Sequence, residues 1–195
     1  MGFKYTSRDF ELGAEIYGWA EDLFPICRSI TGDGVRQTLN YLKEIIPEIK
    51  ILEVPTGTKA FDWEIPKEWN VRDAFIEDKD GNRIVDFKEN NLHLVGYSIP
   101  INDVLDLKEL DKHLYSNPKR PKSIPYVTSY YEDNWGFCLS HNQRAKLPAG
   151  KYRVVVDSSL SNGSLTYGEL LLKGSEKREV FVSTYICHPS LANNE

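Results

Sequence analysis

The feature that most constrains this fold is a nearly continuous run of β-branched and aromatic residues at positions 179–187, close to the carboxyl end of the sequence. A strand exposed on one face alternates apolar and polar residues, whereas a strand covered on both faces is apolar almost throughout. Strands of the second kind are typical of parallel sheets in α/β proteins, where helices cover both faces. The run therefore predicts a central strand of an α/β sheet.

The amino-terminal part of the sequence supplies helices for such a sheet. Apolar residues recur at three- and four-residue spacing over positions 7–27, with Asp9 in the first turn, which predicts an amphipathic helix. Residues 28–34 are rich in glycine and polar residues and predict a turn. A second helix is expected over residues 35–46, followed by a strand over residues 49–54.

The middle of the chain, from residue 55 to about residue 163, has a different texture. Short β-like runs alternate with turn signals, and aromatic residues are frequent. The predicted strands are residues 74–76, 83–85, 92–95 and 151–156, and a proline-rich stretch over residues 118–125 is expected to be extended. A small sandwich or barrel is the simplest fold for this pattern.

We therefore predict the α/β fold class, with a mixed sheet flanked by helices and interrupted by an inserted all-β domain. Residues 1–60 would form the first part of the α/β domain, residues 61–163 the insert, and residues 164–195 the return to the α/β domain. Because no further element follows the apolar run to cover it, the sequence also predicts that the α/β domain is incomplete in this chain.

Charge and composition argue against several classes of partner. The 24 basic and 29 acidic side chains leave a net charge of -5 with no basic stripe, so a nucleic acid partner is not expected. The sequence contains neither a stretch of roughly 18 apolar residues nor a leader-like start, which predicts a cytoplasmic protein without a membrane partner. Cys27, Cys138 and Cys187 are odd in number and lack CxxC spacing, so we expect buried thiols.

His188 is the strongest candidate for chemistry, because it directly follows the predicted central strand. Ligands of α/β sheets bind beyond the carboxyl ends of strands, and a carboxylate six or seven residues later could bind the same metal ion. On local composition alone, an ordinary hydrogen-bonded histidine is the competing interpretation. His93, His113 and His141 have no carboxylate or cysteine at a ligand-like spacing, so we expect them at the surface or hydrogen-bonded.

Three further motifs are weaker. The Gly32-Asp33-Gly34 segment lacks the preceding strand and the Lys-Ser/Thr signature of a phosphate loop, and predicts a helix stop and start. Phe61-Asp62-Trp63-Glu64 places two carboxylates on one face of a strand, as in some glycosidases, but a solvated edge strand is the better interpretation. The aromatic residues of the middle region favour a core, with a sugar-stacking surface as the alternative.

Residues 183–195 resemble the first metal motif of aminopeptidase-like proteins in the co-catalytic zinc peptidase clan. Residues 27–36, 61–66 and 163–169 resemble a bacterial subfamily of that clan with an inserted β domain. Members of that subfamily are often encoded near surface-polysaccharide genes and carry a carboxyl-terminal winged-helix-like domain. The resemblance extends along nearly all of the 195 residues.

The resemblance implies a metal site and also marks two departures from it. His188 matches the first zinc ligand, and Asn194 stands where typical members have the Asp that bridges two zinc ions. An amide is a poor bridge, since it offers one neutral oxygen, but Glu195 follows directly and could supply a carboxylate. Ser190 replaces the Asp that orients a ligand imidazole in typical members. No catalytic residue is assigned, because the family's general base would lie beyond residue 195.

The implied function is a zinc-dependent aminopeptidase or amidohydrolase acting on a peptide or an aminoacylated small substrate. One or two zinc ions are expected in the full-length protein, while this chain alone could bind none. The alternative is a catalytically inactive peptidase-fold binding module that acts in surface-polysaccharide biosynthesis. A homo-oligomer is compatible with either function.

Overall fold

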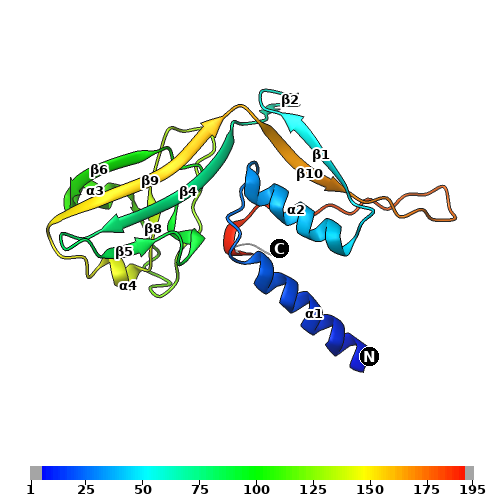
Figure 1. Cartoon of the computed structure of the whole chain (residues 1–195), viewed down its shortest axis with the longest axis horizontal. Helices are drawn as coiled ribbons and strands as arrows, with labels where there is room; N and C mark the ends of the chain where they lie inside the picture. Colours follow the sequence, from blue (N-terminus) through cyan, green and yellow to red (C-terminus); the bar gives the residue numbers. More distant parts are fainter. Residues whose placement is uncertain (1–5, 192–195) are drawn as a thin grey trace.

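The computed structural model describes residues 6–191 (Figure 1). Two helices come first, α1 (Ser7–Leu23) and α2 (Asp33–Ile45). The strands are β1 (Lys50–Pro55), β2 (Lys59–Ala60), β3 (Trp63–Glu64), β4 (Glu68–Glu77), β5 (Arg83–Asp86), β6 (Ile101–Asp106), β7 (Leu114–Tyr115), β8 (Phe137–Cys138), β9 (Lys151–Ser161) and β10 (Ser164–Glu169). The short helices are η1 (Asn91–His93), α3 (Leu107–Leu110), η2 (Asp111–His113), α4 (His141–Arg144) and η3 (Pro189–Leu191).

The main sheet is antiparallel and has the strand order β5-β4-β9-β6. Its centre is the long pair β4 and β9, which runs in register from Glu68↔Ser161 to Glu77↔Arg153 with one irregularity. The strands predicted at residues 74–76, 83–85 and 151–156 are confirmed within β4, β5 and β9. Strand β6 was not predicted, because its sequence INDVLD is too polar to indicate a strand by itself.

The predicted strand over residues 92–95 is wrong, because residues 92 and 93 belong to the 3₁₀ helix η1 and Leu94 makes only an isolated bridge. The Asn90 side chain accepts a hydrogen bond from the Leu92 backbone N–H at 3.0 Å, and this local cap favours a helical turn. The proline-rich stretch is also not extended at its start. Backbone hydrogen bonds from Arg120 to Asn117 and from Ser123 to Arg120 close two successive turns.

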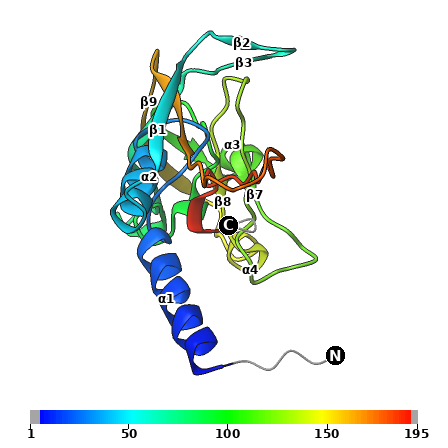
Figure 2. The ribbon, with the colours of Figure 1, turned by 90° about the vertical axis from the view of Figure 1, so that its right-hand side faces the viewer.

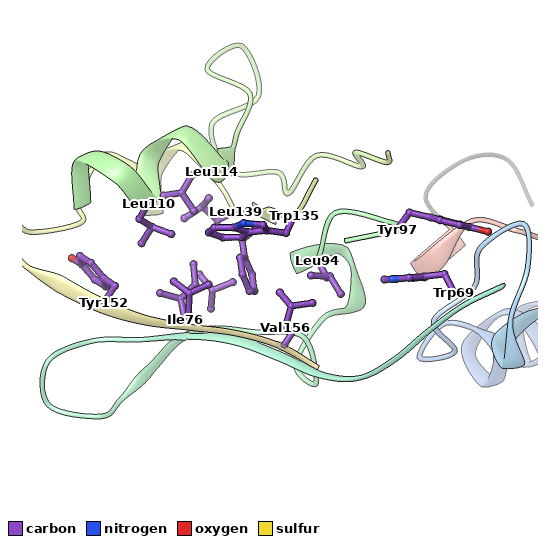
Figure 3. Close-up of a cluster of buried hydrophobic side chains, with 14 residues drawn as sticks. Trp69, Ile76, Leu94, Tyr97, Leu110, Leu114, Trp135, Leu139, Tyr152 and Val156 are labelled. Atoms are coloured by element: carbon purple, nitrogen blue, oxygen red, sulfur yellow. The ribbon is translucent and has the colours of Figure 1, made fainter. Parts of the chain in front are cut away.

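The core lies on one face of the main sheet (Figure 3). Ile76 of β4 and Val156 of β9 face Leu110 of α3 together with Trp135 and Leu139 of the segments that cover the sheet. Short helices therefore pack on the sheet, and this part of the chain is mixed rather than all-β. The domain boundaries expected at residues 61 and 163 remain a prediction.

A second, smaller sheet is formed by β1 and β10, the strands that come before and after the main sheet in the sequence. Strands β1 and β10 pair in antiparallel register from Lys50↔Glu169 to Pro55↔Ser164, which confirms the strand predicted over residues 49–54. Helix α2 packs against β10, where a side chain added at Gly168 would meet Leu39 at 2.9 Å. Within residues 6–191 the one parallel pairing of named strands is the short β7–β8 pair, so no sheet among these residues combines parallel and antiparallel pairings as the predicted mixed sheet would.

The apolar run at residues 179–187 is not a strand in the structure. Val180 and Phe181 are 90% and 91% exposed, so the expectation of a strand buried on both faces is wrong for this chain. A strand requires neighbours that bond its backbone groups, and no segment among residues 6–191 pairs with this run.

Helix α1 is confirmed, although it ends at Leu23 rather than near residue 27. Thr6 and Asp9 form a capping box, and the backbone N–H of Thr6 holds the pKa of Asp9 below its usual value. The amphipathic face, however, is largely exposed: Phe10 is 71% and Tyr17 is 65% exposed. The helix points away from the rest of the chain (Figures 1 and 2). No helix within residues 6–191 combines the length and apolarity needed to cross a membrane.

Candidate functional site around His188

His188 lies between two tyrosine rings, immediately before η3. Its imidazole is edge-on to Tyr126 and Tyr185, with ring centroids 5.3 Å and 5.0 Å away. The Tyr126 hydroxyl lies 3.5 Å from that of Tyr130, and burial is the main cause that raises the pKa of Tyr126. The Tyr126 phenol is therefore neutral at ordinary pH, and its contact with His188 is between uncharged rings on the tyrosine side.

The backbone of His188 is held by a buried arginine from the other end of the sequence. Arg28 is 2% exposed, and its Nε donates a hydrogen bond to the His188 carbonyl oxygen at 3.0 Å. Arg28 belongs to the turn between α1 and α2. The hydrogen bond therefore joins this turn to a residue 160 positions later in the sequence. A guanidinium bonded to a backbone carbonyl fixes the course of the chain at that residue.

The turn that carries Arg28 is itself anchored to the core. The Thr31 hydroxyl lies 2.5 Å from the Tyr97 hydroxyl and accepts a hydrogen bond from the Trp69 backbone N–H at 3.2 Å. Trp69 and Tyr97 stack with centroids 5.6 Å apart at the end of the core nearest α2 (Figure 3). These contacts fix the turn of Arg28 to the core, and Arg28 in turn holds the backbone of His188.

The helix start predicted at Gly32-Asp33-Gly34 is confirmed, whereas the predicted helix stop is not there, because α1 already ends at Leu23. Gly32 is the N-cap of α2 at φ 99°, and the backbone N–H of Asp33 donates to Asn70 Oδ1 of β4 at 2.7 Å. At Gly34 the chain passes so close to Cys27 that an added Cβ would lie 1.9 Å from its carbonyl oxygen. The start of α2 is thus fixed by its contacts with Asn70 and with the Cys27 backbone. These contacts explain the glycines without a phosphate-binding role.

Ser190 is buried and bonded to the first residue of η1 and to its N-cap residue. It is 7% exposed, adopts φ 48°, and its hydroxyl donates to Asn91 Oδ1 and, at 3.4 Å, to Asn90 Oδ1. The resemblance placed an imidazole-orienting residue at this position. The hydrogen bonds of Ser190 instead join η3 to η1.

The residues that the structure describes do not form a metal site by themselves. Between residues 6 and 191, no three His, Cys, Asp or Glu side chains are grouped so that they could hold an ion. A catalytic zinc site takes three protein ligands, and of the predicted set only His188 is described. Asn194 and Glu195 lie outside the described residues. The neighbours of the His188 ring named above are tyrosines, which do not complete the expected ligand set.

The other three histidines are hydrogen-bonded, as expected. His93 Nδ1 lies 2.7 Å from the Cys138 carbonyl oxygen, and His113 Nδ1 lies 3.0 Å from that of Trp135. His141 Nδ1 lies 3.1 Å from the Ser116 hydroxyl. These contacts explain each imidazole without a ligand role.

The cysteines remain thiols, and Cys138 is fully buried while Cys27 and Cys187 are partly exposed. Burial raises the pKa of Cys27 to about 12, although the charge of Arg28 opposes the shift. Burial likewise raises the pKa of Cys138 to about 12. Neither thiol is a thiolate at neutral pH, so neither is suited to nucleophilic catalysis.

An apolar pocket of about 350 Å³ is lined in part by the residues that directly precede His188 in the sequence. It is bounded by α2, by β10 and by residues 184–187, the end of the apolar run. Leu39 of α2 and Leu165 of β10 are among the residues that line it. Sequence reasoning located His188, but it missed Arg28, Tyr126 and Tyr185, because their relation to His188 exists only in the folded chain.

The fold and this site are those of a mixed α/β protein in which a loop arginine secures a histidine at the end of an apolar segment. Residues 68–159 match a family described as Domain of unknown function (DUF2172). The chain is 49% identical over 191 residues to a Clostridium acetobutylicum protein provisionally named a polysaccharide biosynthesis protein with an aminopeptidase-like domain. That alignment covers 98% of this chain and 44% of the relative.

A crystal structure from the same organism agrees with this likeness. It is of a protein provisionally called a peptidase, and it matches this chain with a TM-score of 0.89 and 50% sequence identity. The match covers 92% of this chain and 42% of that one, so the chain spans less than half the length of both relatives. The chain is therefore similar to part of a protein named for an aminopeptidase-like domain and to part of a protein called a peptidase.

Proposed function

We propose that this chain is part of an aminopeptidase-like hydrolase that cleaves an N-terminal peptide or amide bond. The substrate would be a peptide or an aminoacylated sugar, and the process would be polysaccharide biosynthesis. The names of the relatives support the class, and the position of His188 supports its role as one ligand of a zinc site with one or two ions.

The observation that carries the proposal is the hydrogen bond from Arg28 to His188. The motif around His188 resembles the zinc peptidase clan, the motif around Arg28 resembles a bacterial subfamily of that clan, and the two residues are in contact in the structure. A ligand imidazole must be held in a fixed orientation before metal binds, because freezing a mobile side chain weakens affinity. The buried guanidinium fixes the backbone of His188, and the edge contacts with Tyr126 and Tyr185 limit the orientations of its ring.

The proposal is tested by metal analysis and hydrolysis with the full-length protein. We expect bound zinc, hydrolysis of aminoacyl-anilides, and loss of both in His188→Ala. The matched control is His141→Ala, because His141, at the start of α4, is bonded to Ser116 and is predicted to leave zinc content and activity unchanged. Absence of zinc at every tested concentration in a folded full-length protein would exclude the metallohydrolase.

A catalytically inactive peptidase-fold binding module is the second candidate. It is favoured by Ser190, whose hydroxyl bonds to Asn91 instead of supplying an acidic partner to a ligand imidazole. Both proposals include the division of the chain into domains after residues 60 and 163, and both include a cytoplasmic location. If the unsubstituted full-length protein shows no detectable hydrolysis, and its saccharide or protein binding persists in His188→Ala, the module is favoured over the enzyme.

A further inference from the structure

Phe61 occupies a position that folding alone does not favour for phenylalanine. It is the first residue of the turn between β2 and β3, where Ala60 pairs with Trp63, and its φ is 57°. Two-residue hairpin turns take positive φ at this position and strongly prefer glycine, asparagine or aspartate there. A bulky side chain is strained at such a φ, by about 1–2 kcal/mol.

Burial does not compensate for that strain. Phe61 is fully exposed, at 106% of the reference area, so its ring contributes no hydrophobic stabilisation to the described fold. The hairpin itself is well anchored, since Gly57 bonds to Ile65 and Ile65 bonds to Thr58 through the backbone. Figure 2 shows the β2–β3 hairpin projecting beyond the rest of the chain. The ring is therefore held outward on an ordered support.

A second exposed aromatic side chain is fixed to the same hairpin. Tyr131 is 63% exposed, and its hydroxyl donates to the Glu64 carbonyl oxygen of β3 at 3.2 Å. Trp63, between Phe61 and Glu64, is partly exposed. Asp62 and Glu64 of the same hairpin are exposed as well. The hairpin therefore carries exposed aromatic side chains and exposed carboxylates, and Tyr131 joins it from 67 residues away in the sequence.

We propose that Phe61, Trp63 and Tyr131, together with Asp62 and Glu64, form a contact site for the pyranose rings of a saccharide. The electron-rich face of an aromatic ring attracts the polarised C–H groups on one face of a pyranose. Carboxylates accept hydrogen bonds from sugar hydroxyls and thereby orient the ring. The choice of a saccharide rests on the proposed function in polysaccharide biosynthesis, but the site is separate from His188 and requires neither metal nor hydrolysis.

The test compares binding and stability in Phe61→Gly. The probes are cellohexaose, maltohexaose and chitohexaose, titrated calorimetrically into the full-length protein without added metal. At least one probe is expected to bind, and Phe61→Gly and Tyr131→Ala should each raise its Kd by roughly two- to tenfold. The Tm of Phe61→Gly should stay equal or rise, because glycine is relaxed at positive φ. A variant that is more stable yet binds more weakly identifies the ring as a ligand contact.

The matched control is Phe10→Ala, which removes an exposed ring from α1, away from the hairpin, and should leave the Kd unchanged. Three results would overturn the proposal: no binding of any probe, an unchanged Kd in Phe61→Gly, or a lowered Tm or altered oligomeric mass in that variant. The last result would mean that Phe61 packs against protein. Repeating the titration in His188→Ala separates this site from the proposed hydrolase, because loss of zinc or activity should leave saccharide binding intact.

Discussion

At the scale of single residues, Gly34 shows how tightly the turn that carries Arg28 is packed. A Cβ at this position would lie 1.9 Å from the Cys27 carbonyl oxygen, which is backbone and cannot move aside cheaply. Gly34→Ala is therefore expected to lower the free energy of unfolding by about 2–4 kcal/mol, a strain typical of an overpacked site. Urea unfolding followed by tryptophan fluorescence measures the change.

Gly13→Ala is the matched control for that substitution. Gly13 lies within α1, and a Cβ added there would have nothing within 4 Å, so alanine should raise helix stability by about 0.5–1 kcal/mol. Equal stability of Gly34→Ala and the parent protein would show that the turn can shift without strain.

At the scale of elements, Glu68 connects three of them. Glu68 is the first residue of β4. Its Oε2 accepts a hydrogen bond from Arg36 Nη1 of α2 at 3.0 Å and another from the backbone N–H of Ser164 in β10 at 3.1 Å. The bonds from Arg36 are the main cause that lowers the pKa of Glu68 to about 2. This cluster fixes α2 and the β1–β10 layer against the main sheet.

The pH dependence of stability follows from that lowered pKa. Because the folded pKa is about 2 and the ordinary value is 4.5, the contribution of Glu68 is complete above pH 4.5 and is lost as the pH falls towards 2. Glu68→Gln should lower the free energy of unfolding by about 1–3 kcal/mol at pH 7, with a smaller difference from the parent protein at pH 3. Urea titrations at both pH values measure it.

Glu109→Gln is the control, since Glu109 makes an exposed pair with Lys112 and is expected to have no measurable effect. A deficit in Glu68→Gln that is equally large at pH 7 and pH 3 would contradict the ionic explanation and point to packing.

At the scale of the whole molecule, stability is concentrated in the main sheet. Strands β4 and β9 form its longest pairing and contribute buried side chains such as Ile76 and Val154. Helix α1 has only Leu23 buried, and residues 180–182 are almost fully exposed. Native-state hydrogen exchange should therefore find the slowest amides in β4 and β9 and the fastest in α1 and near residue 181. Comparable protection in α1 and β9 would contradict this order.

Much of the fold was predictable from the sequence alone. Periodicity at three and four residues located α1 and α2, and short β-branched runs located β1 and parts of β4, β5 and β9, because these elements depend on local patterns. The absence of ligand-like spacing predicted that His93, His113 and His141 are either at the surface or hydrogen-bonded, and the structure shows hydrogen bonds for all three.

The tertiary structure alone decided the rest. The run at residues 179–187 has the composition of a buried strand, but a strand exists only where a neighbour bonds to it, and none of the described residues does so. The hydrogen bond from Arg28 to His188 spans 160 positions, and the strained, exposed Phe61 is recognisable only from its φ and its exposure. Local sequence sets the conformational preference of each segment, whereas contacts between distant segments determine which preferences are realised and which side chains meet.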